Sequence, residues 1–291
     1  FCLLFSVFSL WGQDSYWKQQ TQVTKPLPLS LQAKQAPREY QLDGEAFEAA
    51  LQSSLSKGTP LYFPNTRGGY DAFSIQEIQT FSKELSTNYP TIRAYKGKSL
   101  NNRGTSVYLA VSPKGLSVTT QPAEGQGYYF IEQQADGATY VLSFKEHMLG
   151  EKDFLCKTTG LGAETVSKAS AVGLSKKTTW RTYRLAVAAS GEYTQYHGGT
   201  VEGALAAMNA TVTRVNALFG KDLGLQLQLV PQTANVIYTD PETDPFTTDL
   251  NNEIQSTLTA NIGEANYDIG HLFHRDNNNG NAGFIGAVCQ D

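Results

Sequence analysis

The sequence predicts an α+β domain followed by an α/β domain, the second with a mostly parallel sheet and an antiparallel edge strand. The first half places two helical patterns ahead of short apolar runs separated by tight-turn residues. From Trp180 onward, strand-like runs alternate with long amphipathic helices, and this order favours right-handed crossovers and parallel pairing. A length of 291 residues is typical of about two domains.

Composition divides the chain into five zones. Residues 1–13 are an apolar run of signal-peptide length, too short to span a bilayer, and we interpret them as a signal-peptide remnant. Residues 14–38 are polar, contain three prolines and predict a linker. The first folded domain occupies 39–156, a Gly-, Ser- and Lys-containing flexible linker occupies 157–178, and the second domain occupies 179–291.

Charge and cysteine content narrow the class of protein. The net charge is −4 and 17% of residues are charged, so the sequence offers no basic patch for nucleic acid. No segment after the signal is apolar and long enough to cross a membrane. The signal predicts a secreted, extracellular protein. Only Cys156 and Cys289 remain after its removal, which excludes a disulfide-dense scaffold.

In the first domain, Phe47, Leu51 and Leu55 lie at helical spacing, and Asp43 is a suitable N-cap. A second helix is expected over 74–89, ended by Pro90. Strands are expected over 106–111, 115–119, 128–132 and 139–144, with turns at 113–115 and 135–137.

The second domain alternates element types. Strands are expected over 182–188, 225–230, 267–273 and 282–288, and helices over 200–219 and 250–262. Thr200 and Gly220 are the expected start and end of the first helix, and Thr248 and Gly263 those of the second.

The ordered series RLAVAASGEYTQYHG, a long helix, LQLQLV, YDIGHLF and NAGFIGAVC resembles the first part of a reprolysin-like metzincin zinc metalloprotease domain. The signal, TNYPTIRAYKGKSL and SVYLAVSPKGLSV resemble the N-terminal pro-region of its bacterial secreted members. The resemblance implies a metalloendopeptidase zymogen with a pro-domain over 39–156 that acts against an incomplete metzincin-like catalytic domain. No H-E-x-x-H motif occurs in the 291 residues, so we expect a chain truncated before it.

The same resemblance implies the chemistry of the whole enzyme. Zinc held by three His would activate a water and polarise the scissile carbonyl of a peptide or protein substrate, with a Glu as general base. None of those ligands is present, so we expect this chain to be inactive by itself.

By the resemblance, the substrate main chain pairs with the last strand. Its residues are Gly283, Phe284, Ile285, Gly286, Ala287 and Val288. An edge strand presents unpaired N–H and C=O groups, and small side chains allow another backbone to approach. An ordinary glycine-bearing hairpin is the alternative interpretation.

Cys156, at the end of the predicted pro-domain, is a candidate zinc-binding switch. A propeptide thiolate can occupy the open position of a catalytic zinc and keep a zymogen inactive. A buried free thiol and a disulfide with Cys289 remain as alternatives. The resemblance favours a partner for Cys289 outside these residues.

Other polar motifs are weaker candidates. Some relatives bind calcium through a Glu in the first strand and an Asp in the third; Asp268 matches the second, but Arg184 occupies the place of the first and argues against calcium. His271 and His274 are three apart on a strand, so they would face opposite sides and not share a metal. We interpret 276–281 (DNNNGN) as a turn and the Asn209-Ala210-Thr211 glycosylation signal as coincidental.

Two non-enzymatic functions remain open. The α/β domain could be a secreted adhesin or peptide-binding module that uses its open edge strand. The chain could also be a structural or inhibitory domain.

Overall fold

The computed structural model describes residues 16–20, 37–123, 127–144, 155–156, 159–160, 180–275, 279–282 and 284–285. The chain forms two compact units. The first contains 1–78, 95–109 and 115–148, and the second contains 79–94, 110–114 and 149–291. Residues 79–94 therefore belong with the second unit, although the sequence assigns them to the pro-domain.

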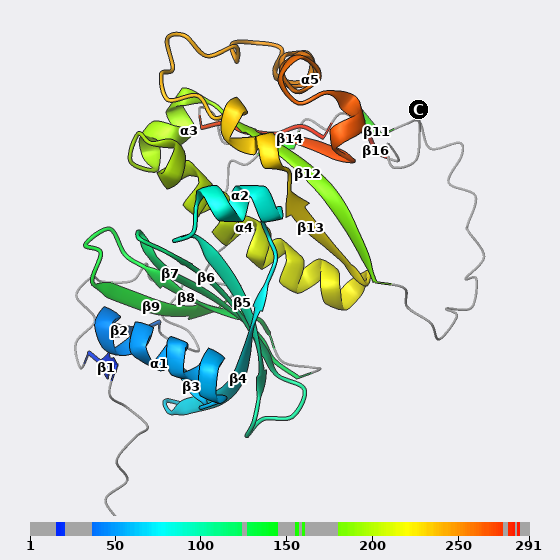
Figure 1. The fold of residues 1–291 in the computed structure, drawn as a ribbon. Helices are drawn as coiled ribbons and strands as arrows, with labels where there is room; N and C mark the ends of the chain where they lie inside the picture. Colours follow the sequence, from blue (N-terminus) through cyan, green and yellow to red (C-terminus); the bar gives the residue numbers. More distant parts are fainter. Residues whose placement is uncertain are drawn as a thin grey trace, which may run out of the picture. The chain divides into compact units, whose positions relative to one another are not determined.

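The first unit is built on a nine-stranded sheet in the order β1-β2-β9-β8-β7-β6-β5-β4-β3. Its strands, coloured blue to green in Figure 1, are β1 (Trp17–Gln19), β2 (Arg38–Leu42), β3 (Leu61–Pro64), β4 (Tyr70–Ile78), β5 (Arg93–Ser99), β6 (Ser106–Ser112), β7 (Gly115–Gln121), β8 (Tyr129–Gln133) and β9 (Thr139–Phe144). The pairs β1–β2, β2–β9, β9–β8, β8–β7 and β3–β4 are antiparallel. The four strands predicted between 106 and 144 are confirmed within two residues at each end.

Side chains at the start of β1 connect it to β3, the strand at the opposite end of the sheet. The Tyr16 hydroxyl donates to the Tyr62 carbonyl (3.2 Å) and accepts from the Tyr62 amide N–H (2.6 Å). The Trp17 indole N–H donates to the same carbonyl (3.1 Å). Both side chains are buried, so β1 and β3 are linked and the sheet is nearly closed. These residues lie in the range that the sequence analysis assigned to a linker.

An aromatic core fills the first unit. The Trp17 ring contacts those of Tyr40, Phe63 and Tyr140, with centroids 5.5–6.3 Å apart. Helix α1 (Gly44–Lys57) adds Phe47, whose ring centroid lies 6.2 Å from that of Phe63. The predicted cap is confirmed, because the Asp43 carboxylate accepts from the Ala46 N–H (3.1 Å).

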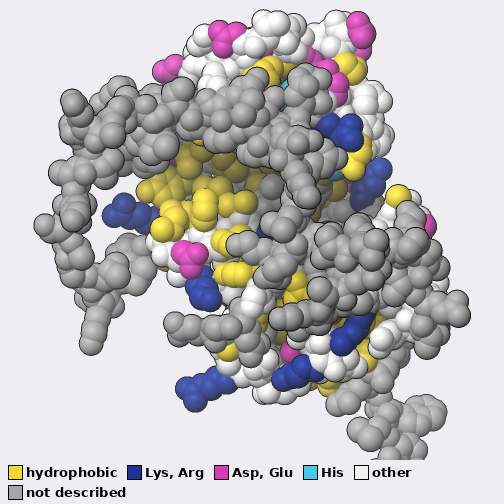
Figure 2. All heavy atoms as spheres, turned by 180° about the vertical axis from the view of Figure 1, so that it is seen from behind, with side chains coloured by type: hydrophobic (Ala, Val, Ile, Leu, Met, Phe, Trp, Pro, Cys, Tyr) yellow, Lys and Arg dark blue, Asp and Glu magenta, His cyan; other side chains and the backbone are white. Residues whose placement is uncertain are grey.

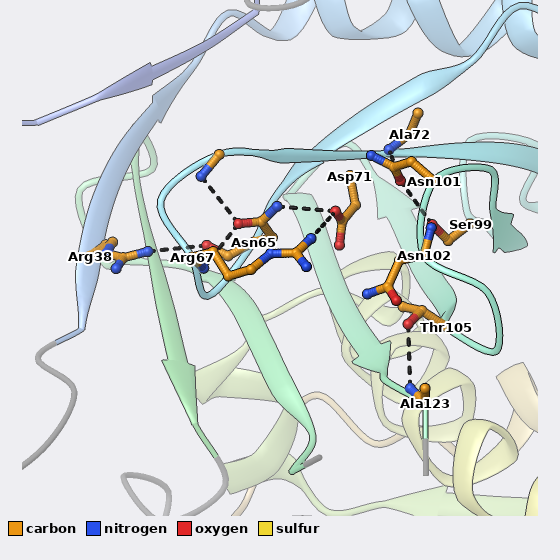
Figure 3. A network of polar contacts seen from close by, with 11 residues as sticks. Arg38, Asn65, Arg67, Asp71, Ala72, Ser99, Asn101, Asn102, Thr105 and Ala123 are labelled. Atoms are coloured by element: carbon orange, nitrogen blue, oxygen red, sulfur yellow. Dashed lines mark hydrogen bonds and ion pairs between the residues drawn. The ribbon is translucent and has the colours of Figure 1, made fainter. Parts of the chain in front are cut away.

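A polar network orders the turn between β3 and β4 (Figure 3). The Asn65 amide oxygen accepts from the N–H groups of Arg67 (3.0 Å) and Gly69 (3.1 Å). The buried Asp71 carboxylate accepts from the Asn65 amide (3.0 Å) and the Arg67 guanidinium (2.9 Å). The charge of Asp71 is thus paired, which a buried carboxylate requires.

The helix predicted over 74–89 was wrong in its first half. Residues 70–78 form strand β4, and only Lys83–Asn88 form helix α2. Phe73 and Ile75 are buried while Ser74 and Gln76 are exposed, so burial follows a period of two. The neighbouring strand explains this choice: a Cβ at Gly97 would lie 2.4 Å from Ile75, so glycine lets β5 pass close to that side chain.

The predicted fold class, an α+β domain followed by an α/β domain with a mostly parallel sheet, was also wrong. The largest sheet is antiparallel, and the parallel pairs among the described residues lie in a three-stranded sheet, two short ladders and two isolated bridges. Short turns such as 113–114 and 134–138 can join only antiparallel neighbours, whereas parallel neighbours require a long crossover. The sequence analysis did not predict strands β1 to β5, which make up much of the antiparallel sheet.

The second unit contains a three-stranded sheet in the order β13-β12-β14. Its strands are β12 (Arg181–Ala189), β13 (Leu225–Leu229) and β14 (Ile269–Phe273), all parallel. They are connected by α3 (Gly191–Tyr196), α4 (Val201–Asp222), α5 (Leu250–Asn261) and the 3₁₀ helices η3 (Pro231–Val236) and η4 (Glu264–Asn266) (Figure 1).

Strand β12 is buried on both faces. Leu185, Val187 and Ala189 belong to one apolar core with α4. Ala186 and Ala188 belong to another with α5. This two-sided burial explains the continuous apolar run of β12, as in other parallel sheets covered on both sides.

The helix boundaries in the second unit agree partly with the predictions. Thr200 caps α4 as predicted, since its hydroxyl accepts from the Gly203 N–H (3.0 Å). Gly220 does not end α4; a Cβ there would lie 2.8 Å from the Trp180 ring, so glycine makes room for the indole. Thr248 is not the side-chain cap of α5: the Glu253 carboxylate accepts from the N–H groups of Thr247 (2.9 Å) and Thr248 (3.2 Å) instead.

Some apolar side chains stay at the surface of the second unit. Figure 2 shows hydrophobic side chains, in yellow, exposed on the face seen from behind. Trp180, Phe219 and Leu223, near the end of α4, are exposed by 52%, 38% and 60%. These three side chains contribute exposed apolar surface to the second unit.

The Tyr16 hydroxyl supplies our first prediction. Tyr16→Phe removes a group that bonds both backbone atoms of Tyr62, so the free energy of unfolding of the first unit should fall by about 1–3 kcal/mol. Urea denaturation measures it. The control is Tyr196→Phe at an exposed side chain, and equal effects of the two substitutions would contradict the link between β1 and β3.

Candidate functional site

The carboxyl ends of β12 and β14 meet at the start of α3. The Ser190 N–H donates to the Phe273 carbonyl (3.0 Å), and the Ser190 hydroxyl accepts from the Tyr193 N–H (3.4 Å) to cap the helix. The buried Asp244 carboxylate accepts from the Gly191 N–H (2.6 Å). These bonds fix α3 at the edge of the sheet where ligands bind in open α/β folds.

Aromatic and His side chains gather at this edge. The His197 ring lies 4.5 Å from that of Tyr193 and 4.9 Å from that of Tyr196, and the Tyr193 ring lies 5.2 Å from that of Phe273. The Arg275 guanidinium lies 4.0 Å from the centre of the Tyr196 ring. Burial lowers the pKa of His197, and the charges of Arg275 and Lys114 lower it further. This aromatic surface, with a cationic guanidinium on one of its rings, is suited to side-chain contacts with a bound chain.

The residues at this edge do not form a zinc site. The His271 ring stacks edge-on against Phe273 (5.2 Å), and His274 Nδ1 lies 3.7 Å from a carboxylate oxygen of Glu192. Within the described part of the chain, no three His, Cys, Asp or Glu residues converge as metal ligands. The donor set therefore does not fit zinc, and we derive no chemical step through a metal from these residues.

Two short stretches of the 279–285 segment pair with the end of the predicted pro-domain and the start of the predicted linker. Strand β15 (Asn279–Gly280) is parallel to β10 (Leu155–Cys156), with Cys156 opposite Gly280. Strand β16 (Phe284–Ile285) is parallel to β11 (Thr159–Gly160), with Thr159 opposite Phe284. Both ladders lie within the second unit. Asn279 and Gly280, which we assigned to a turn, are thus extended and paired.

Two of the six residues predicted to bind substrate lie in one of these ladders. Phe284 and Ile285 form a strand whose backbone pairs with another segment. Gly283, Gly286, Ala287 and Val288 lie outside the described residues. Residues 155–160 could not be identified as the partner from sequence alone, because a two-residue ladder has no readable period.

The pairing has a direction. The family resemblance implies a substrate that runs antiparallel to residues 283–288, whereas Thr159–Gly160 runs parallel to Phe284–Ile285. In either direction an extended chain uses the N–H and C=O groups of the strand that it joins. The β11–β16 ladder therefore occupies backbone groups on one side of two of the six predicted substrate-binding residues.

Arg184 and Asp268 form a separate polar site. The Arg184 guanidinium donates to the Asp268 carboxylate (2.7 and 3.2 Å) and to the Ala265 carbonyl (2.7 Å). The Arg184 N–H also donates to that carboxylate (2.7 Å). These bonds hold the pKa of Asp268 below its usual range. A side-chain cation thus sits on the carboxylate that the resemblance associates with calcium.

Taken together, these features define an α/β unit whose accessible edge pairs with an extended chain and whose carboxyl end carries aromatic side chains. Residues 179–291 match the family model described as "Metallo-peptidase family M12B Reprolysin-like". The match confirms, for residues 179–291, the resemblance to reprolysin-like metalloproteases drawn from the sequence. No curated protein matches the chain.

Among the residues that the structure describes, no helix combines the length and apolarity needed to cross a bilayer.

The Arg184–Asp268 pair predicts a pH dependence. Because the pKa of Asp268 is lowered in the folded chain, the stabilisation is complete above its usual value of 3.8 and is lost as the pH falls through the lowered value. Arg184→Gln should therefore reduce the loss of stability between about pH 5 and pH 2.5.

Urea denaturation across that range measures the effect. Arg181→Gln, at an exposed position on the same strand, is the matched control. A wild-type acid dependence in the Arg184→Gln variant would contradict the prediction.

Proposed function

We propose that this chain is part of the zymogen of a secreted zinc metalloendopeptidase, with 279–285 as the segment that pairs with peptide substrates. The observation that carries the proposal is the parallel pairing of 155–160 with 279–285 in a region that matches the metallopeptidase family. In this proposal residues 155–160 pair with the segment that would bind substrate, and this pairing keeps the enzyme latent.

Backbone pairing favours a peptide as the ligand of this segment. Main-chain bonds to a sheet edge recognise any extended polypeptide, and side-chain pockets then select among sequences. The aromatic surface around Tyr193, Tyr196 and His197 supplies such contacts nearby. Here the chain's own residues would bind and orient a substrate and would not transfer protons.

The metal must be assigned elsewhere. Zinc would polarise the scissile carbonyl and activate water in the complete enzyme. The 291 residues contain no H-E-x-x-H, so the proposal assigns the zinc ligands and the general base to residues outside them.

Cys156 is the proposed switch residue. Its backbone lies opposite Gly280 in the β10–β15 ladder. A propeptide thiolate is a chemically suitable ligand for the zinc of the complete enzyme. A disulfide with Cys289 and a free buried thiol are the competing assignments. Secretion rests on the signal-like run at 1–13 and enters the proposal on that ground.

The 291-residue chain by itself should lack peptidase activity. With zinc supplied, we expect no cleavage of a casein or quenched-fluorescent peptide library above a buffer blank. Chelator-sensitive cleavage by the purified chain would show that a metal site exists within these residues and would refute this part of the proposal.

The switch is tested in the full-length precursor. Cys156→Ser should raise the peptidase activity of the uncleaved protein, because serine is a poor zinc ligand compared with a thiolate. Cys289→Ser is the control for loss of a thiol or a disulfide. Latency unchanged by Cys156→Ser would sink the switch, and activity raised equally by both substitutions would favour the disulfide.

A further inference from the structure

The outer edge of β13 is occupied by a segment that comes from the N-terminal half of the chain. The Leu229 N–H donates to the Thr80 carbonyl (2.7 Å), and the Ser82 N–H donates to the Leu229 carbonyl (2.8 Å). Phe81 and Leu229 form a parallel bridge. The Gln228 side-chain amide adds a bond to the Phe81 carbonyl (3.1 Å). Residues 80–82 thus act as a short extra strand on this sheet.

The same segment contributes to the apolar core of the second unit. Phe81, Leu85 and Ile92 are exposed by only 2%, 0% and 2%. They share a core with side chains of β12, β13 and α4, among them Val187 and Met208. Helix α2, which carries Leu85, is capped by Ser82, whose hydroxyl accepts from the Leu85 N–H (3.2 Å). Removing this segment would open the core to water.

Asn209 on α4 joins both ends of the segment. Its amide oxygen accepts from the Thr80 hydroxyl (2.5 Å), and its amide N–H donates to the Arg93 carbonyl (2.9 Å). Asn209 is 1% exposed and Thr80 is 3% exposed. At the surface, the Thr91 hydroxyl donates to the Glu202 carboxylate (3.0 Å). Asn209 is therefore a structural residue, because its buried amide oxygen and amide nitrogen both form hydrogen bonds. This is consistent with treating its glycosylation signal as coincidental.

We propose that residues 79–94 are a docking element for the β13 edge and the face of α4, and that they keep the N-terminal region bound to the second unit after the connecting chain is cut. The partner of this surface is therefore a strand-and-helix peptide of the protein's own N-terminal half. The attachment is separate from the ladders at 155–160, so proteolysis in the linker alone does not release the N-terminal region. The inference holds whether or not the peptidase proposal does, because it concerns contacts inside the second unit.

The test cuts the full chain between the two attachments. A site-specific protease sequence inserted between Phe144 and Leu155 separates 79–94 from 155–291 while leaving both ladders on the C-terminal fragment. After cleavage of the folded protein, we expect the N-terminal fragment to co-purify with a tagged C-terminal fragment at micromolar concentration. Separation of the wild-type fragments at that concentration would overturn the proposal.

A matched pair of variants tests whether retention of the N-terminal fragment depends on the Thr80 contact. Thr80→Val leaves the buried Asn209 oxygen without its donor and should weaken retention about tenfold. Thr87→Val, on exposed α2 surface where the hydroxyl bonds only within its own helix, should leave retention unchanged. Equal weakening by both variants would contradict a docking role for Thr80.

A stability measurement on the uncut chain without the inserted protease site tests the same contact even if the insertion prevents folding. In a double-mutant cycle of Thr80→Val and Asn209→Ala, the double variant should be no less stable than Asn209→Ala alone, because the bond that Thr80→Val removes is already absent in Asn209→Ala. Additive effects of the two substitutions would count against the proposal.

Discussion

Backbone groups at the edges of the small parallel sheet need partners, and this requirement organises the second unit. A three-stranded sheet leaves a row of N–H and C=O groups on each side, and such rows attract any extended chain. On β13 the requirement is met by residues 80–82, through bonds between Leu229 and the Thr80 and Ser82 backbones. The 279–285 segment pairs with 155–160 in the same parallel sense. Two separate stretches, residues 80–82 from the N-terminal half and residues 155–160, therefore supply pairing strands within the second unit.

The two contacts differ in kind. Residues 79–94 combine backbone pairing with three buried apolar side chains and the bonds of Asn209, so they form part of the core. The ladders at 155–160 contain two residues each and rest on backbone bonds. Short ladders without a helix open more readily than a packed core. In the function proposed above, residues 79–94 would be the retained attachment and residues 155–160 the displaceable cover.

Much of this could be predicted from the sequence, for physical reasons. The long periodic pattern of α4 and the apolar run of β12 are strong local signals, and both elements were found nearly at their bounds. The helix over 74–89 was predicted wrongly because Ile75, Ile78, Phe81 and Leu85 recur at three- and four-residue steps, which is helical spacing, while Phe73 and Ile75 also fit the period of two of a strand. Only tertiary contacts decide between them: β5 passes Ile75 at Gly97, and β13 receives Phe81. Arg184 opposite Asp268 was visible in the sequence as a departure from the calcium pattern, but its bonds to that carboxylate were not.

Residue-level amide hydrogen exchange of the intact chain tests most directly whether an N-terminal segment completes the sheet. The Leu229 N–H, which donates to the Thr80 carbonyl, and the Ser82 N–H should exchange as slowly as the amides inside β12, because both would then open only when the core does. Fast exchange at Leu229 and Ser82, beside slow exchange in β12, would mean that the β13 edge is open in solution and would contradict the account.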